Sequence, residues 1–224
     1  MKSSGPAADW QEMDSFDGGF SWIAYPDETM ERASHGLAVD GEVWLVDPVD
    51  AEGIDDRIEE YGEVAGVVIL LDRHKRDAAA FATRHDVSVW VPAFMDGVVE
   101  ELDAPTERFR HELADTGYVA HTLVDNRMWQ EAILYHEDDG VLVVPEAVGT
   151  TSYFRAAGES LGVHPMLRLT PPRELDRFNP ERVLVGHGPG IHEDVADTVG
   201  DAIDGSRRRA PQLMFKTVKD TVFG

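Results

Sequence analysis

The sequence contains no cysteine, and this absence removes several kinds of chemistry at once. Disulfides, thiolate metal ligands and a cysteine nucleophile are all excluded. A metal site in this chain would have to use histidine and carboxylate side chains. Long apolar runs are also missing, since no stretch approaches the roughly 18 residues of a membrane span, and the segment after Met1 has no signal-peptide pattern. We therefore expect a cytoplasmic protein without membrane contact.

Lysine is scarce, and negative charge is abundant. Asp and Glu total 43 against 20 Lys and Arg, which gives a formal net charge of −23, and only four of the basic residues are lysine. An acidic, lysine-poor surface stays hydrated where salt screens charge, so we expect a high-salt cytoplasm, with an ordinary acidic protein as the alternative. The charge argues against nucleic-acid binding. It leaves a small molecule or a protein as the partner.

Apolar runs and turn signals divide the chain into alternating strands and helices. The strands expected in the first half are 43–46, 67–71 and 87–91, with helices at 55–61 and 75–84. The middle is expected to hold antiparallel strands at 98–102, 118–124, 131–135 and 141–144, and the end a helix, a strand and a helix at 152–158, 183–185 and 192–203. Such βαβ units flanking a meander predict two sheets with helices on their outer faces.

Composition separates the two ends of the chain from the middle. Residues 1–19 are polar and glycine-rich, so we expect a loose lead-in. Residues 20–205 carry the alternating pattern and are expected to form one domain. The C-terminal segment 206–224 holds five basic residues and one acidic residue, and we expect it to pack its apolar side chains on the acidic domain. A tail that binds a partner is the alternative.

Four segments resemble, in order and spacing, the motifs of the metallo-β-lactamase superfamily. The segments are Val43–Asp47, Val68–Ala80, Ile133–Ala147 and Pro180–Gly188. Val68–Ala80 resembles the strand, metal loop and alanine-rich helix that carry Thr-His-x-His-x-Asp-His, and the last segment ends in the family's Gly-His-Gly. The resemblance implies an α/β fold, a four-layer αββα sandwich. It also implies that Asp47 supports the metal loop.

The site residues implied by the resemblance are largely replaced. In the metal loop Asp72 stands for the first His, His74 for the second, Arg76 for the Asp and Asp77 for the third His. The family's middle His falls on Arg127, and the bridging Asp falls on Glu146. Only His74 and His187 keep their residue type. Because arginine stays protonated and offers no lone pair, two inward arginines would oppose two-metal chemistry.

Two functional hypotheses follow from these replacements. In the first, Asp72, Arg76, Asp77, Arg127 and Glu146 form a network of ion pairs where metals would bind, no cofactor is present, and the non-catalytic cleft binds a small ligand or a partner. In the second, His74 and His187, with Asp77 and Glu146, hold one zinc or iron ion in a hydrolase of an ester, thioester or similar bond. His121, His136 and His164 are further histidines that we expect at the mouth of the cleft, and His121, in a strand just before Arg127, is the foremost of them. The substrate and the oligomeric state are not indicated by the sequence.

Overall fold

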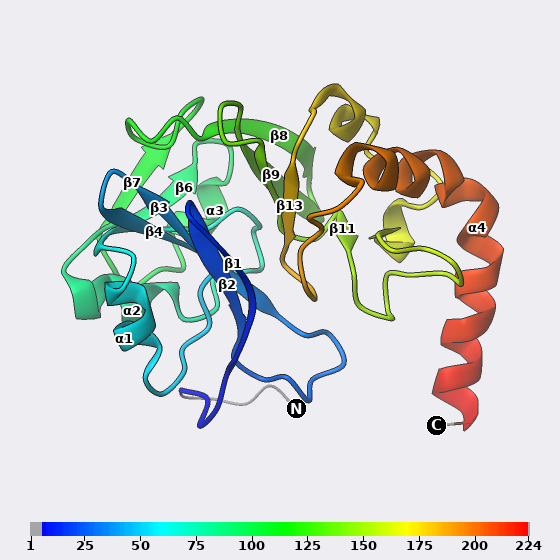
Figure 1. Ribbon diagram of the computed structural model, residues 1–224, viewed down its shortest axis with the longest axis horizontal. Helices are drawn as coiled ribbons and strands as arrows, with labels where there is room; N and C mark the ends of the chain where they lie inside the picture. Colours follow the sequence, from blue (N-terminus) through cyan, green and yellow to red (C-terminus); the bar gives the residue numbers. More distant parts are fainter. Residues whose placement is uncertain (1–5, 224) are drawn as a thin grey trace.

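The computed structural model describes residues 6–223, with side chains through residue 213. Its larger sheet has seven strands in chain order, from β1 to β7 (Figure 1). These strands are β1 (Gln11–Phe16), β2 (Gly19–Ile23), β3 (Ala33–Val39), β4 (Glu42–Val46), β5 (Glu63–Val68), β6 (Val89–Pro92) and β7 (Thr106–Phe109). Pairing is antiparallel from β1 to β4 and parallel from β4 to β7. The parallel strands need crossover connections, and the short helices α1 (Ile54–Glu59), α2 (Ala78–His85) and α3 (Asp96–Val99) lie in them.

A second sheet has the strand order β13-β10-β9-β8. Its strands are β8 (Val119–Asn126), β9 (Trp129–His136), β10 (Val141–Val144) and β13 (Arg182–Val185). The turn Glu137–Gly140 joins β9 to β10, as its sequence predicts, because Gly140 adopts a positive φ of 60°. A two-stranded ribbon of β11 (Val148–Gly149) and β12 (Gly162–Val163) follows, with the 3-10 turns η1 (Pro165–Leu167) and η2 (Arg173–Arg177) after it.

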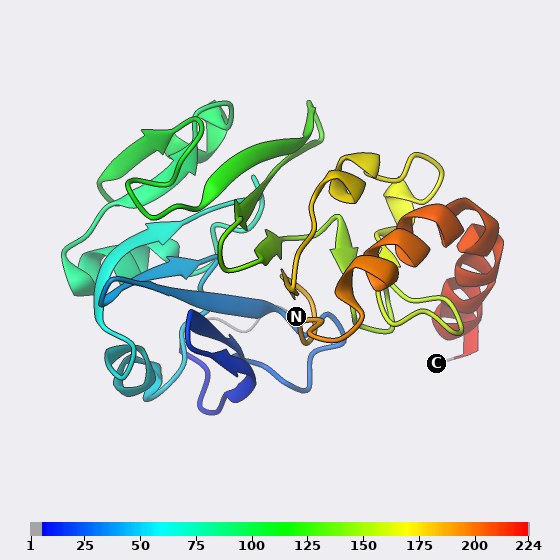
Figure 2. The same ribbon diagram turned by 45° about the horizontal axis from the view of Figure 1, so that its top comes forward.

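Two apolar cores hold the layers together. The first lies around the larger sheet and includes Trp22, Leu45 and Phe81, which are fully buried. The second lies between the smaller sheet and the long helix α4 (Val195–Phe223), and Val185 and Ile203 belong to this cluster of buried residues. Figure 2 shows α4 beyond the smaller sheet, on the side opposite α1 and α2. This arrangement is the αββα sandwich that the sequence predicts.

The carboxyl ends of four strands meet where the two sheets face each other. β4 is followed by Asp47, β5 by the loop 69–77, β10 by Glu146 and β13 by His187. The two sheets are joined here by backbone hydrogen bonds, from Ala33 N to Gly186 O and from Ala132 N to Leu70 O. Ligands bind in α/β proteins outside the carboxyl ends of strands, so a site is expected at this edge.

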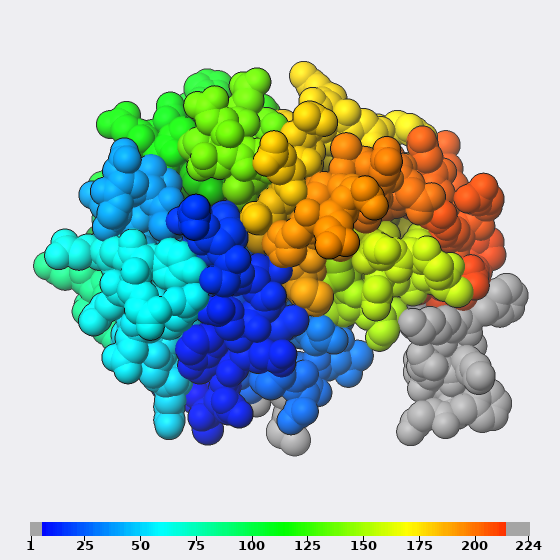
Figure 3. Space-filling view, viewed as in Figure 1, coloured from blue at the N-terminus to red at the C-terminus, as the bar shows by residue number. Residues whose placement is uncertain are grey.

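Several predicted segments differ in the structure. Residues 1–19 are not all a loose lead-in, because 11–16 form β1, and Figure 3 shows the β1–β2 hairpin on the surface between the two halves of the molecule. Residues 98–102 are not a strand, since α3 covers 96–99 and β7 begins at Thr106, and 152–158 forms turns rather than a helix. Short apolar runs do not distinguish strand from helix by periodicity alone.

The C-terminal segment continues α4 rather than forming a separate element. Ala210 and Leu213 are buried, at 5% and 2% exposure, so its beginning packs on the domain. Met214, Phe215 and Val218 were expected to pack as well, and their side chains lie outside the described residues. Among the residues that the structure describes, no helix has the length and apolar character required to cross a membrane.

Candidate metal centre

Three side chains from different strand ends converge in the interior. His74, Glu146 and His187 each present one ligand atom, and the three atoms lie within 4.8 Å of one another. Oε2 of Glu146 is 3.2 Å from Nε2 of His74 and 3.8 Å from Nε2 of His187. All three residues are buried. Two imidazoles and a carboxylate in this arrangement match the ligand types of a zinc or iron site.

Hydrogen bonds on the far sides of both imidazoles fix their orientation. Nδ1 of His74 is 3.0 Å from Oδ2 of Asp47, and Nδ1 of His187 is 2.8 Å from the carbonyl oxygen of Met30. A carboxylate and a carbonyl only accept, so Nδ1 carries the proton in each ring and donates it. Burial lowers the pKa of His187, which favours the neutral ring. The neutral ring of His187 therefore directs its Nε2 lone pair toward Glu146, and Nε2 of His74 faces the same carboxylate.

Nε2 of His187 is buried and has no hydrogen-bond partner within the described chain. It faces Nε2 of His74 and the carboxylate of Glu146. These three atoms turn lone pairs toward one another unless a proton or a cation lies between them. A bound cation satisfies all three at once, and the donor set thus fits a metal ion.

The two oxygens of Glu146 have different neighbours. Oε2 faces the two imidazoles described above, whereas Oε1 is 3.1 Å from Nη2 of Arg73 and 3.5 Å from Nε2 of His164. Nδ1 of His164 accepts the N–H of Met166, so Nε2 of the neutral His164 ring carries the proton and points it at Glu146. Oε1 is therefore held by two donors, and Oε2 remains for a ligand role.

The pKa of Glu146 reflects this crowding. Burial alone raises the pKa of its carboxyl, but the imidazoles of His187 and His74 lower it by more, and the net pKa lies well below the usual range.

A second glutamate holds the backbone beneath Glu146. Oε1 of Glu131 accepts the N–H groups of Glu146 and Ala147 at 2.8 and 2.9 Å, and Oε2 accepts Nε1–H of Trp129 at 2.7 Å. Glu131 is fully buried, and burial raises its pKa to about 7 despite these donors. The sequence motifs do not single out this residue. The signal available was a carboxylate inside a strand, 129–135, whose remaining residues are apolar except Gln130.

Arg76 lies beside the three candidate ligands. Its guanidinium donates to the carbonyl oxygens of Ala33, Asp47 and Gly186, the last two at 2.7 and 3.2 Å. Nη2 also lies 3.5 Å from Nε2 of His74. Burial lowers the pKa of Arg76 to about 10, so the side chain remains protonated at neutral pH. The site thus contains one fixed positive charge of its own.

Aromatic rings and Arg73 cover the centre. The Arg73 guanidinium lies 4.3 Å from the Trp129 ring centroid while it pairs with Glu146. Trp129 packs edge-on against His164 at 4.8 Å, and Phe154 stacks on His187 at 5.4 Å. Arg73 is the most exposed of these, with 39% of its side chain accessible. Arg73, which the sequence motifs do not single out, is thus a partly exposed side chain in direct contact with Glu146.

Three of the predicted site residues do not take part in the predicted network. Asp77 lies at the start of α2 and accepts the N–H of Asp50 at 2.8 Å. Asp72 accepts the N–H of Gln130 at 3.1 Å and contacts Arg73. Arg127 is exposed in the β8–β9 turn and has no side-chain partner within the described residues. The predicted network with Arg127 in the cleft is wrong, because the hairpin extends past the strand ends and carries its tip into solvent.

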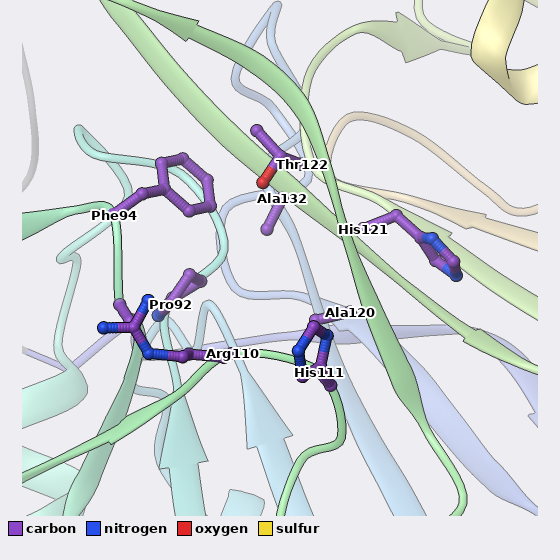
Figure 4. Close-up of a pocket in the computed structure, with 9 residues that line it drawn as sticks. Pro92, Phe94, Arg110, His111, Ala120, His121, Thr122 and Ala132 are labelled. Atoms are coloured by element: carbon purple, nitrogen blue, oxygen red, sulfur yellow. The ribbon is translucent and has the colours of Figure 1, made fainter.

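A small cavity of about 220 Å³ lies at the carboxyl ends of β6 and β7, where they face β8 and β9. Its lining residues are Pro92, Ala93, Phe94, Arg110, His111, Ala120, His121, Thr122 and Ala132. None of the three candidate ligands lines it. His121, expected near the cleft, turns its ring away from Phe94 and Thr122 in Figure 4 and packs on Phe178 at 4.9 Å. His121 is not part of the candidate centre.

Solved structures with the same architecture identify the fold. A structure of DIM-1 metallo-β-lactamase exposed to ceftazidime matches with a TM-score of 0.67 and 13% identity, over 92% of this chain and 99% of that one. The chain has a metallo-β-lactamase fold. TMB-1 matches this fold with a TM-score of 0.64 and 12% identity, over 92% of this chain and 98% of that one. FIM-1 from Pseudomonas aeruginosa, in its mono-zinc form, matches with a TM-score of 0.58 and 10% identity, over 90% of this chain and 98% of that one.

No protein-family model matches the sequence, and no curated protein is similar to it. The structure confirms the metallo-β-lactamase fold that the four sequence motifs imply. The sequence itself has diverged, since it is only 12–13% identical to DIM-1 and TMB-1.

Proposed function

We propose that the protein binds one divalent metal ion, of the zinc or iron class, through His74, Glu146 and His187, and hydrolyses a small ester, thioester or similar bond. The observation that carries the proposal is the buried Nε2 of His187, which has no hydrogen-bond partner among the described residues and faces Glu146 and His74. Three protein ligands would leave a coordination position open, as in catalytic zinc sites. The mono-zinc structure of FIM-1 supports the view that one ion is compatible with this fold.

Residues around the three ligands would hold them in position for such an ion. Asp47 and the Met30 carbonyl hold the two imidazoles in the ligating tautomer, while Arg73 and His164 hold the second oxygen of Glu146. A bound divalent ion supplies Lewis-acid polarisation of a substrate oxygen. The protonated Arg76 adds a fixed positive charge, which favours negative charge that develops on the substrate.

The enclosure of the centre limits the substrate to a small molecule. His74, Glu146 and His187 are 6%, 8% and 4% exposed. Access past Arg73 requires its guanidinium to leave Glu146 and the face of Trp129. Because Arg73 is the exposed member of the cover, we propose that it moves when a substrate enters.

A metal-free binding cleft is the second candidate function. Arg73 and His164 already donate to Glu146, and Arg76 lies close enough to His74 for a weak hydrogen bond. These contacts neutralise part of the cluster without an ion. The non-catalytic alternative therefore rests on Arg73 and Arg76. The hydrolase proposal rests on Nε2 of His187, which has no hydrogen-bond partner among the described residues.

Hydrolysis assays on metal-stripped and zinc-loaded protein test the proposal. A panel of small esters, thioesters, lactones and phosphodiesters would be compared in the wild type, Glu146→Gln and a control, Glu101→Gln, whose carboxylate is exposed and pairs with Lys75. We expect zinc-dependent turnover in the wild type and the control, and its loss in Glu146→Gln. Turnover that survives chelation, or no turnover on any zinc-loaded sample, would count against a one-ion hydrolase.

A further inference from the structure

The backbone conformation of Arg76 and its hydrogen bonds hold its side chain in one position. It adopts a positive φ of 41°, a left-handed conformation that costs a residue with a Cβ about 1 kcal/mol or more. The turn directs its side chain back across the strand ends rather than along α2. Backbone carbonyls from three segments, at Ala33, Asp47 and Gly186, then receive its guanidinium. The fold therefore holds this cation in one place.

The guanidinium of Arg76 lies next to the candidate ligands. Nη2 lies 3.5 Å from Nε2 of His74, the same atom that faces Glu146 at 3.2 Å. A guanidinium cannot ligate a metal, because it is protonated and has no free lone pair. It repels a nearby cation, and the repulsion is strong at a site with little water. Nε of Arg76 is itself buried and has no hydrogen-bond partner among the described residues, whereas its two terminal nitrogens face the carbonyls and His74.

We propose that Arg76 is a built-in cation that restricts this centre to a single divalent ion and weakens the binding of that ion. The inference rests on the proposed metal site at His74, Glu146 and His187. Arg76 acts on the ion through its charge, and it is therefore a positioning residue. In the metal-free protein its Nη2 lies 3.5 Å from the Nε2 of His74 that the ion would use.

The test measures zinc affinity and stoichiometry in the wild type, Arg76→Gln and Arg76→Lys. Lysine keeps the charge and supplies three donors for the three carbonyls, whereas glutamine removes the charge. We expect one ion per chain in the wild type and in Arg76→Lys, with affinities within about threefold of each other. Without the charge, we expect Arg76→Gln to bind zinc about tenfold or more tightly. Arg108→Gln is the matched control, because Arg108 is exposed and pairs only with Asp96 within the described residues.

The outcomes separate this inference from the proposed function. If the wild type binds no zinc while Arg76→Gln binds one ion, the inference about Arg76 holds and the proposed metal function of the wild type fails. Equal affinities in Arg76→Gln and Arg76→Lys would overturn the inference while leaving a metal site in place. Should Arg76→Gln not fold, native mass spectrometry of the wild type at saturating zinc decides, since one ion supports the inference and two ions overturn it.

Discussion

Asp47 holds His74 by a hydrogen bond from the imidazole Nδ1 to the carboxylate Oδ2, at 3.0 Å. Its other oxygen accepts the N–H of Leu70 at 3.1 Å, so the carboxylate is fixed to the strand that carries the metal loop. This pair sets the tautomer of His74 and turns Nε2 toward Glu146.

Asp47→Asn should weaken zinc binding by about 10- to 100-fold, because the amide loses the negative charge that supports His74 as a ligand. Asparagine tolerates the positive φ of 47° at this position, so the backbone is expected to remain unchanged. Zinc affinity measured by competition with a chromophoric chelator checks the effect. Asp138→Asn, in the exposed β9–β10 turn, is the control, and equal affinities in the two variants would contradict a role for Asp47.

His35 should make the metal-free protein less stable as pH falls from about 6.5 to about 4. Burial lowers the pKa of His35 from 6.5 to about 4, and Nδ1 lies 2.8 Å from the Ser21 hydroxyl. In this window the unfolded chain binds a proton that the folded chain does not, so stability falls with falling pH, by up to about 3 kcal/mol. Urea unfolding at several pH values measures the slope.

His35→Gln should flatten that slope, because the ring that must stay neutral in the folded state is gone. The exposed His111 provides a matched control, and His111→Gln should leave the slope as in the wild type. A wild-type slope in His35→Gln would show that other groups carry the acid sensitivity.

Gly186→Ala should destabilise the fold by about 1–3 kcal/mol and disturb the centre. A Cβ at Gly186 would lie 2.1 Å from the carbonyl oxygen of Pro145, a backbone atom that cannot move away cheaply. Gly186 also precedes His187, and Pro145 precedes Glu146, so the clash separates two candidate ligands. Gly200→Ala in α4 is the control, since nothing lies within 4 Å of its added Cβ. Denaturant unfolding and zinc affinity of both variants measure the difference.

The sequence predicted the fold and part of the centre because both depend on strand ends. Apolar runs locate β4, β5, β10 and β13, and the residues that follow a strand's carboxyl end have little freedom of position. Asp47, His74, Glu146 and His187 therefore lie together, as their motif positions imply.

The remaining features depend on side-chain direction and loop length, which a motif does not encode. Arg127 was aligned with a ligand by counting residues, but the β8–β9 hairpin carries it into solvent. Arg73 lies between Asp72 and His74 in the motif, and only the structure shows that it reaches Glu146 and Trp129. His164 is distant in sequence and arrives through the β11–β12 ribbon.

The metal content of the purified protein tests the central claim most directly. Wild-type protein and His187→Gln would be loaded with zinc, dialysed against metal-free buffer and analysed for zinc per chain. The account predicts one ion per chain in the wild type and a loss of that ion in His187→Gln, because the buried Nε2 of His187 is a ligand. A wild type that retains no zinc, or a His187→Gln variant that retains as much as the wild type, would contradict it.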